Sequence, residues 1–327
     1  MISRRTFGKV LGGASLALAD ARANAAADFP NRQIRMLIGL TPGGPSDTQL
    51  RIVCEQVKTL IGQSVVVENR PGAAHTIAMA ALKSAAPDGY TLGNVNSTVA
   101  SLPLVRDNLT FDLLTDYQPV CLGVMQPPNL LVVRASFPAN NLQEFIAYAK
   151  ANPGKLNYGS DGAGSQTHIA GEELKRLTGI DMVHIPFAGN GSEMVALLKG
   201  EIELGQLSLP IVMQYIRSGE LKALANPSAE RSPLLPELPT AIEQGLGNYI
   251  VSLWTSIWAP RGVPADIMAI LTEKFIQGYR EPAVKKRLED LGFTVVAGQP
   301  DALIRAARDE LERWRDTVRL SNIKIKS

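Results

Sequence analysis

The chain has 327 residues, of which 33 are basic and 31 acidic, so its formal net charge is +2. Because the first 27 residues hold four basic side chains and one acidic side chain, the rest of the chain carries about −1. A nearly neutral chain without a basic run is poorly suited to nucleic acid or to an anionic membrane, so the composition excludes both partners. Any anion that it binds must be neutralised by groups in the binding site itself, and not by the overall charge of the chain.

The first 27 residues have the order of a cleavable export signal. Arg4 and Arg5 form a basic pair, residues 10–19 are modestly apolar, and residues 23–27 are a small-residue run. The apolar run is about half the ~20 residues that a membrane span needs. The arginine pair indicates twin-arginine export, so we expect residues 1–27 to be removed and the mature protein to be periplasmic. The alternative is a cytosolic tail with a chance arginine pair.

The mature sequence alternates short apolar runs with helical patterns, which is typical of an α/β fold. A first set of strands is expected at residues 34–40, 65–67 and 90–92. The helix between the first two strands has one apolar stripe at spacings of three and four, made by Leu50, Val53, Cys54, Val57, Leu60 and Ile61. Ser46 and Gln49 fit a capping box at its start, Gly62 fits its end, and another helix is expected at 77–82.

A second set of strands is expected at residues 130–133, 156–159, 182–187, 202–207 and 221–224. Helices should separate them, including one at 142–151 and one capped by Ser192. After the Pro-rich residues 232–239, the run 250–258 predicts one long strand, and Pro264 opens the first of the last helices.

This grouping predicts two α/β lobes, each with its own sheet. Lobe 1 would comprise residues 28–127 and 249–327, and lobe 2 residues 128–248. The chain would then cross between the lobes twice, near 126–130 and 251–260, and the two crossings would act as a hinge.

Two pairs of residues leave alternatives open. Cys54 and Cys121 lie in apolar patterns and are interpreted as buried free thiols, although the periplasm would also permit a disulfide. Trp254 and Trp258 lie in the return crossing, where they pack in the core or hinge, or place a ring in the cleft.

Glycine-containing turns recur between a strand and a capped helix, at residues 43–44, 72–74, 162–165 and 189–192. Helix N-termini leave unpaired N–H groups and carry about half a positive charge each. Glycine lets that backbone approach a ligand closely. Two such turns in each lobe suit a small molecule with one or two carboxylates, although α/β folds also use Gly turns for structure alone.

Other functions fit the sequence poorly. The turn 162–164 resembles a dinucleotide fingerprint, but its third glycine position is Thr167 and the following strand lacks a terminal acidic residue. A triad of Ser165, His168 and Asp161 can be written on paper, but Ser165 also suits an N-cap. The spacing of His75, His168 and His184 matches no common zinc site. We expect no catalysis, cofactor or metal, and we interpret His184 as a core residue.

Several motifs together resemble one family, the Bug-type extracytoplasmic solute receptors of tripartite tricarboxylate transporters. The N-terminal half carries Thr41-Pro42-Gly43-Gly44-Pro45-Ser46-Asp47, Val67-Glu68-Asn69-Arg70-Pro71-Gly72-Ala73 and Pro87-Asp88-Gly89-Tyr90-Thr91-Leu92. The match continues through 149–156, 159–165 with His168, 184–189, 238–240 and 258–260. The resemblance spans the mature chain in order.

The resemblance implies a type II, Venus-flytrap periplasmic binding fold with ligand between the lobes. It implies that backbone amides and ordered water hold a carboxylate. It also implies membrane permease subunits as partners and no enzyme activity, and we expect a monomer. The expected ligand-binding residues are Thr41, Gly43, Gly44, Ser46, Asp47, Gly72, Ala73, His75, Asp161, Gly162, Gly164, Ser165, His168, Ala188 and Gly189.

The chain departs from the family pattern in two places. The family often has Gly-Ala-Gly-Gly where this chain has Gly72-Ala73-Ala74-His75, and often has Lys where this chain has Ala188. Both changes bear on which acid is bound. A receptor of the same fold that feeds a signalling partner, and an exported hydrolase, are the competing hypotheses.

Overall fold

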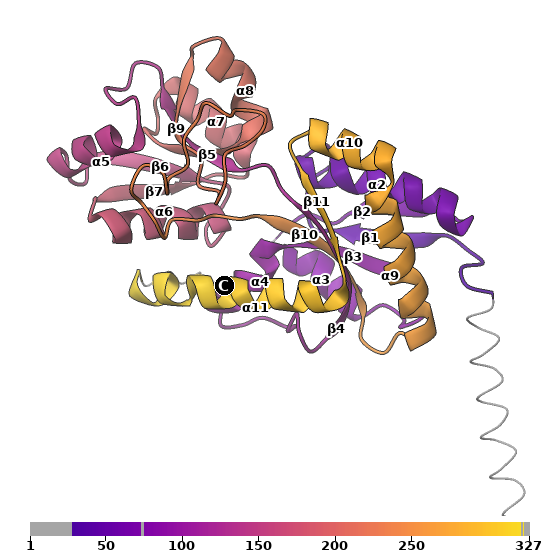
Figure 1. Ribbon diagram of the computed structural model, residues 1–327. Coiled ribbons are helices and arrows are strands. Elements are labelled where there is room, and N and C mark those ends of the chain that lie inside the picture. Colours follow the sequence, from indigo (N-terminus) through magenta and orange to yellow (C-terminus); the bar gives the residue numbers. More distant parts are fainter. Residues whose placement is uncertain (1–27, 73–74, 322, 324–327) are drawn as a thin grey trace, which may run out of the picture.

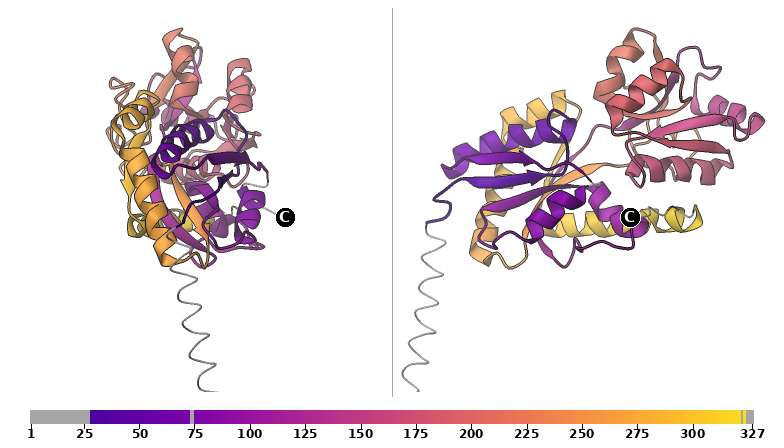
Figure 2. Two further views of the ribbon diagram at one scale, coloured as in Figure 1. Left: turned by 90° about the vertical axis from the view of Figure 1, so that its right-hand side faces the viewer. Right: turned by 180° about the vertical axis from the view of Figure 1, so that it is seen from behind.

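Figure 1 shows the computed structural model, which describes residues 28–72, 75–321 and 323. The predicted export signal at residues 1–27 lies outside the described residues. Two α/β lobes stand side by side and are joined by two stretches of chain, as the view from behind in Figure 2 also shows. None of the helices within the described residues is long and apolar enough to cross a membrane.

The sheet of lobe 1 has six strands in the order β11-β4-β10-β3-β1-β2. Their bounds are β1 Ile34–Ile38, β2 Val65–Asn69, β3 Thr91–Asn96, β4 Tyr117–Met125, β10 Trp254–Pro260 and β11 Thr294–Gly298. Strands β2, β1 and β3 run parallel, whereas β10 is antiparallel to both of its neighbours. In β1 four of the five residues are buried, as expected for a parallel strand with helices on both faces.

Two groups of helices cover the sheet of lobe 1. One face carries α2 (Pro45–Ile61), α9 (Ala265–Arg280) and α10 (Pro282–Asp290). The other carries α3 (Thr76–Lys83), α4 (Ser97–Val105) and α11 (Pro300–Leu320). Each group buries its apolar face against the strands, so the sheet lies at the centre of this lobe.

The first helix after β1 shows what the sequence predicts well and where it fails. Leu50, Val53, Cys54 and Val57 of α2 are buried together, which confirms the central part of the predicted stripe. The helix ends at Gly62 in the left-handed conformation, also as predicted. The predicted capping box is wrong, because the helix begins earlier, with Gly44 as N-cap and Pro45 in its first turn. Proline needs no N–H partner there and its φ already suits a helix.

Lobe 2 is built from shorter strands. Strand β5 (Asn129–Arg134) lies between β8 (Gly205–Ser208) and β9 (Leu221–Ala225), antiparallel to both. Strands β6 (Leu156–Ser160) and β7 (Met182–Pro186) form a parallel pair. A bridge between Tyr158 and Leu204, next to β8, joins that pair to the other three strands. The helices are α5 (Leu142–Ala151), α6 (Gln166–Thr178), α7 (Asn190–Lys199) and α8 (Leu209–Arg217).

The two chain crossings lie against each other. One joins β4 to β5, and the other leads into β10, whose first residue is Trp254 rather than a residue near 250. The backbone N–H of Gln126 donates to the carbonyl of Leu253 at 2.7 Å, so the crossings are hydrogen-bonded side by side. We propose the same division of the chain as from sequence, with lobe 2 spanning residues 128–248.

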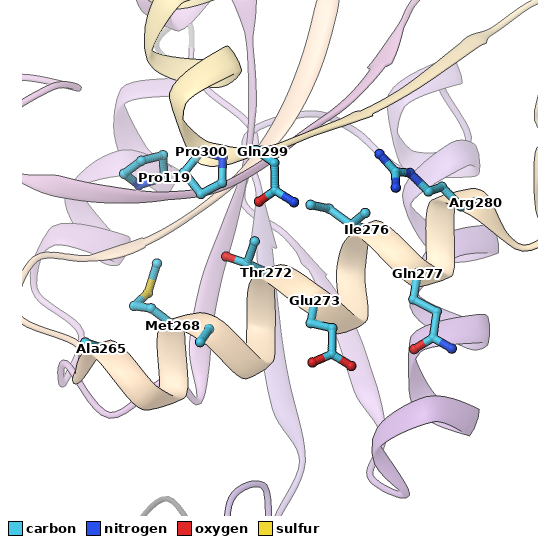
Figure 3. Close-up of a pocket in the computed structure, with 11 residues that line it drawn as sticks. Pro119, Ala265, Met268, Thr272, Glu273, Ile276, Gln277, Arg280, Gln299 and Pro300 are labelled. Atoms are coloured by element: carbon cyan, nitrogen blue, oxygen red, sulfur yellow. The ribbon is translucent and has the colours of Figure 1, made fainter.

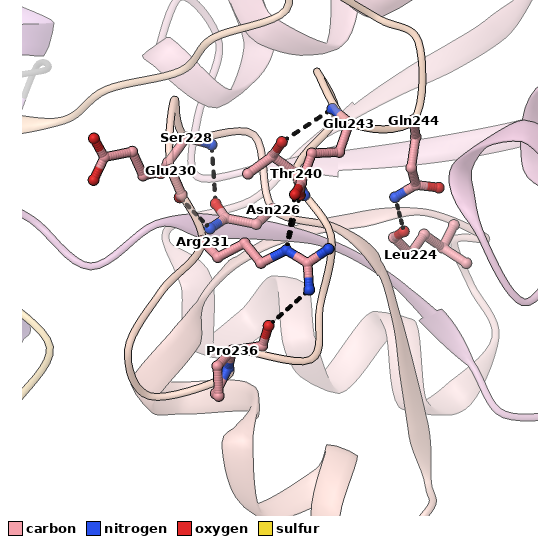
Figure 4. Close-up of polar contacts among 9 residues, drawn as sticks. All are labelled: Leu224, Asn226, Ser228, Glu230, Arg231, Pro236, Thr240, Glu243 and Gln244. Carbon is pink, nitrogen blue, oxygen red and sulfur yellow. Dashed lines mark hydrogen bonds and ion pairs between the residues drawn. The ribbon is translucent and has the colours of Figure 1, made fainter.

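The loop before the second crossing is held by its own polar contacts (Figure 4). Arg231 donates to both carboxylate oxygens of Glu243, at 3.0 and 2.9 Å, and to the carbonyl of Pro236 at 2.9 Å. Glu243 also accepts from the N–H of Thr240 at 2.7 Å. These contacts fix an irregular segment on the outside of lobe 2, so that the chain re-enters the hinge at a defined place.

The cysteines and the crossing tryptophans belong to the core. Cys54 and Cys121 are buried and free, as predicted. Trp254 is 3% exposed and Trp258 is fully buried. The indole N–H of Trp258 donates to Ser256 Oγ at 2.9 Å, so this ring is satisfied inside lobe 1.

Helix α11 extends from lobe 1 along the side of lobe 2 and ties the lobes together (Figure 1). Gln166 of α6 accepts from Ser97 of α4 at 2.6 Å and donates to Glu310 of α11. Trp314 donates to the same carboxylate oxygen of Glu310. Thr317 of α11 donates to Glu173 of α6 at 2.7 Å. We call this buried set of contacts between α4, α6 and α11 the polar seam.

The polar seam should make stability depend on pH through Glu310. Burial raises the pKa of its carboxyl group from 4.5 to about 7, although hydrogen bonds from Trp314 and Gln166 act in the opposite direction. The folded state therefore favours the protonated form. Its contribution to stability is full below pH 4.5 and is lost as the pH rises through about 7.

We expect Glu310→Gln, which cannot titrate, to remove that loss. At about 1.4 kcal/mol per pKa unit, the difference between the unfolding free energies of wild type and variant should change by up to about 3 kcal/mol between pH 4.5 and 8. Urea unfolding at both pH values measures it. Glu312→Gln, an exposed carboxylate on the same helix that pairs with Arg315, is the control and should leave the pH dependence unchanged. Parallel pH profiles for wild type and Glu310→Gln would contradict the assignment.

Candidate functional site

A cavity of about 450 Å³ lies between the lobes. This volume is in the range of small-molecule sites. Both lobes and both chain crossings contribute to its wall, since Gln126 and Leu253 are included. The lining residues are Leu40, Thr41, Gly44, Pro45, Ser46, Asn96, Thr98, Gln126, Asn129, Asp161, Gln166, Thr167, Ala188, Gly189, Asn190, Gly191, Ser192, Ser208, Ile211 and Leu253.

Five helices begin at this cavity. Helices α2 and α4 reach it from lobe 1, and α6, α7 and α8 from lobe 2, each with its N-cap or a residue of its first turn in the wall. The first N–H groups of a helix have no partner within the helix and carry partial positive charge. The strands before these helices end at the same place, as in other open α/β sheets that bind ligands at the carboxyl ends of their strands. The cavity is therefore built to receive negative charge.

No cationic side chain shares this task within the described part of the wall. None of the described lining residues is Lys, Arg or His, and Asp161 is the one that can ionise. The remaining side chains are amides, hydroxyls and small or aliphatic groups. A bound anion would thus be neutralised by main-chain N–H groups, hydroxyls and amides.

The lobe 1 turn places Thr41, Gly44 and Ser46 in the wall. Gly43 adopts a φ of 84° and is not among the lining residues. Asp47 lies beneath the turn, 3% exposed, and accepts hydrogen bonds from Gly43, Arg51 and Asn69. Burial raises the pKa of this carboxyl group, but these hydrogen bonds outweigh the effect and hold the pKa below its usual value. In the structure Asp47 stabilises the turn through these hydrogen bonds.

The second lobe 1 turn lies away from the cavity in the described residues. Gly72 and His75 are not among the lining residues, and Ala73 lies outside the described residues. His75 begins α3 with a φ of 73°, and burial lowers the pKa of its imidazole to about 4. Its backbone packs tightly on Gly39, at the end of β1, where an added Cβ would lie 2.8 Å from the Cα of His75. This contact sets the position of α3 against β1.

In the lobe 2 turn Asp161 reaches the wall, whereas Gly162, Gly164, Ser165 and His168 shape the turn behind it. Ser165 is the N-cap of α6 and accepts from the N–H of His168, as the sequence predicted. The Nδ1 atom of His168 accepts from the N–H of Gly164 at 2.9 Å. The ring of His168 stacks on His184 with centroids 3.7 Å apart.

The stacked histidines are neutral supports for that turn. Burial lowers the pKa of His168, and burial together with the neighbouring His168 and Lys175 lowers that of His184 to about 3. His184 shares a hydrogen bond of 2.7 Å with Ser160 Oγ. The side chains of Ser165, His168 and Asp161 therefore do not form a catalytic triad, because Ser165 caps the helix and the His168 ring faces Gly164 and His184. No cluster of metal-binding side chains exists within the described residues.

The last lobe 2 turn brings Ala188 and Gly189 into the wall together with the first residues of α7. Gly189 has a φ of 143°, and an added Cβ would meet nothing within 4 Å. The side-chain oxygen of Asn190 accepts from the N–H of Ser208, which fixes the start of α7 against the start of α8.

Several lining residues were not foreseen from the sequence. Asn96 is the last residue of β3 and the N-cap of α4, which also supplies Thr98, and Ser208 is the last residue of β8 and the N-cap of α8. A hydroxyl or amide side chain at the carboxyl end of a strand was the available signal. Gln126, Asn129 and Leu253 come from the hinge side, where no motif marks them.

A larger hollow of about 830 Å³ lies elsewhere, on the outer surface of lobe 1 along α9 (Figure 3). Side chains of α9 such as Met268, Thr272 and Arg280 face Gln299 and Pro300 at the start of α11. It is an open groove on one lobe, where only α9 and α11 begin among the described residues, whereas five helices from both lobes begin at the inter-lobe cavity. The inter-lobe cavity is therefore the candidate site.

The comparisons with known proteins agree with this geometry. Residues 49–323 match the family described as "Tripartite tricarboxylate transporter family receptor". The chain belongs to this family. Two similar proteins come from Bordetella pertussis. A UPF0065 protein is 36% identical over 92% of this chain and 93% of its own length, and Protein BugT is 33% identical over 96% and 97%.

Solved structures of similar proteins show the same two-lobed periplasmic binding fold. The periplasmic binding protein BugD is 30% identical, with a TM-score of 0.81 over 91% of this chain and all of its own. Rpa4515 of R. palustris, solved with adipate, is 29% identical with a TM-score of 0.83 over 91% and 100%. MatC of Rhodopseudomonas palustris, with bound malate, is 32% identical with a TM-score of 0.79 over 89% and 100%. The chain is thus a periplasmic solute-binding receptor and not an enzyme.

The contact between Gly39 and His75 gives a prediction on stability. Gly39→Ala should lower the unfolding free energy by roughly 1–3 kcal/mol, because the new methyl group meets backbone that cannot rotate away. Thermal unfolding should show a lower midpoint. Gly247→Ala, where an added Cβ meets nothing within 4 Å, is the control. An unchanged midpoint for Gly39→Ala would show that α3 can move freely away from β1.

Proposed function

We propose that this receptor captures a small organic acid in the inter-lobe cavity and delivers it to the membrane permease subunits of a tripartite tricarboxylate-type transporter. The observation that carries the proposal is the convergence of five helix N-termini on a cavity whose described lining residues include no Lys, Arg or His. Such a site favours an anion over a neutral sugar or a cation.

Two features support the choice of a carboxylate. Adipate and malate occupy the similar receptors Rpa4515 and MatC, and both are small carboxylic acids. The cavity also offers hydroxyl and amide groups, from Thr41, Ser46 and Asn129 among others, that can donate to carboxylate oxygens. We propose that Thr41, Gly44, Ser46, Asp161, Ala188 and Gly189 contact the ligand, together with the starts of α4, α7 and α8.

Delivery requires a change of shape that the partner can recognise. Ligand contacts come from both lobes, so ligand stabilises the arrangement in which the lobes are close and shifts the population toward it. Family membership favours a permease over a signalling protein as the partner. We further infer that residues 1–27 are a cleavable export signal and that the mature protein acts as a monomer.

Gly191 allows the cavity to be blocked without disturbing the fold. It lines the cavity, and an added Cβ would meet nothing within 4 Å. Gly191→Trp should therefore fill the space where ligand sits and reduce carboxylate affinity at least 100-fold, with little change in the thermal midpoint of the free protein. Calorimetric titration of the mature protein against a panel of dicarboxylic and tricarboxylic acids measures the affinity.

The matched control is Gly247→Trp, which adds the same side chain at an equally open position outside the cavity. This control should bind like the wild type. Full affinity in Gly191→Trp would place the ligand elsewhere, and binding of neutral sugars but of no acid by the wild type would overturn the proposed function.

A further inference from the structure

The wall of the inter-lobe cavity carries one acidic side chain. Asp161, at the turn after β6, is exposed and is the ionisable residue among the described lining residues. Its Oδ1 atom accepts from Thr167 Oγ1 at 2.5 Å, and its backbone N–H donates to the same hydroxyl at 3.1 Å. The carboxylate is therefore anchored to the first turn of α6 and stays at the cavity.

Asp161 has unused capacity to accept hydrogen bonds. A carboxylate has about four acceptor sites, and in the described part of the chain only Thr167 donates to this one. No basic side chain forms an ion pair with it there. Across the cavity, the Oδ1 atom of the lining residue Asn96 is buried and has no donor among the described residues. Each lobe thus offers the cavity a side-chain oxygen that can accept a further hydrogen bond.

These acceptors conflict with a ligand that is anionic throughout. The helix N-termini favour a carboxylate, but a second carboxylate near Asp161 would meet like charge. A protonated amine would instead form a charge-assisted hydrogen bond with Asp161. The wall is complementary to a molecule that is negative at one end and positive at another.

We propose that the ligand is an amino acid, an organic acid that also carries a protonated amine, and that Asp161 is the specificity-determining residue that pairs with this amine. This inference rests on the proposed function, because it assigns a second group to an acid bound in the same cavity. The carboxylate is held by the helix starts, and Asp161 selects among acids of the same length.

Matched pairs of ligands test the proposal, since each pair differs only in the amine: L-aspartate and succinate, L-glutamate and glutarate, L-2-aminoadipate and adipate. Calorimetric titration of the mature wild-type protein should show, in at least one pair, tighter binding of the amino acid by tenfold or more. Asp161→Asn keeps an acceptor for Thr167 and removes the charge. This variant should bind the amino acid more weakly and the plain diacid more tightly than the wild type does, so that the ratio of their affinities falls at least tenfold.

Asp181→Asn is the control, because Asp181 is also an exposed acidic residue of lobe 2 but does not line the cavity. It should preserve the ratio. Equal or tighter binding of the plain diacid by the wild type, or an unchanged ratio in Asp161→Asn, would overturn the inference and leave the proposed function intact. Failure of every acid to bind the wild type would overturn both.

Discussion

The unpaired N–H groups at the starts of α2, α4, α6, α7 and α8 are the constraint on which the rest of the structure depends. Each start carries only about half a positive charge, so several helices must begin at one place to neutralise an anion. Strands of both lobes that end beside the cavity achieve this, because each of the five helices follows the end of a strand. The near-zero net charge of residues 28–327 is consistent with this arrangement, which needs no excess of basic residues.

A site made of main-chain dipoles differs physically from one built on arginine. A guanidinium group that becomes buried when the site closes loses its hydrogen bonds to water, and the ligand must replace them. Helix N–H groups carry smaller charges that are already oriented, so little reorganisation accompanies binding or release. A carboxylate held in this way is released without breaking an ion pair to a desolvated guanidinium group.

The two lobes are linked at the base of the cavity by contacts that also touch the ligand site. Gln166 lines the cavity, and its side chain joins Ser97 of lobe 1 to Glu310 of α11. The two chain crossings are joined to each other at Gln126, whose side chain also donates to Ser46 at 3.2 Å. Movement of one lobe therefore changes the surroundings of residues in the wall, which gives ligand and lobe position a direct physical connection.

Much of this could be predicted from the sequence, since strands, stripes and glycine turns are local patterns. Helix α4 was missed because Ser97–Val105 contains Pro103 and has no amphipathic stripe, and β4 because Pro119 and Gly123 interrupt it. Because α4 was not predicted, Asn96 and Thr98 at its start were not predicted as residues of the site. The polar seam joins residues 69 and 144 positions apart, and no local pattern reports such contacts.

Glycine shows most clearly why a sequence motif identifies a turn but not its role. At Gly159 and Gly171 an added Cβ would lie within 3 Å of Glu193 or Tyr158, so these glycines allow elements to pack. At Gly43 and Gly189 the backbone has positive φ, and an added Cβ would meet nothing within 4 Å. Packing therefore does not require glycine at either position, and at Gly189, which lines the cavity, the open space lets a ligand reach the main chain. Gly62 and Gly179 also have positive φ and open space, yet they only end helices. The place of a turn at the inter-lobe cavity, which the sequence does not report, therefore separates a binding turn from a structural one.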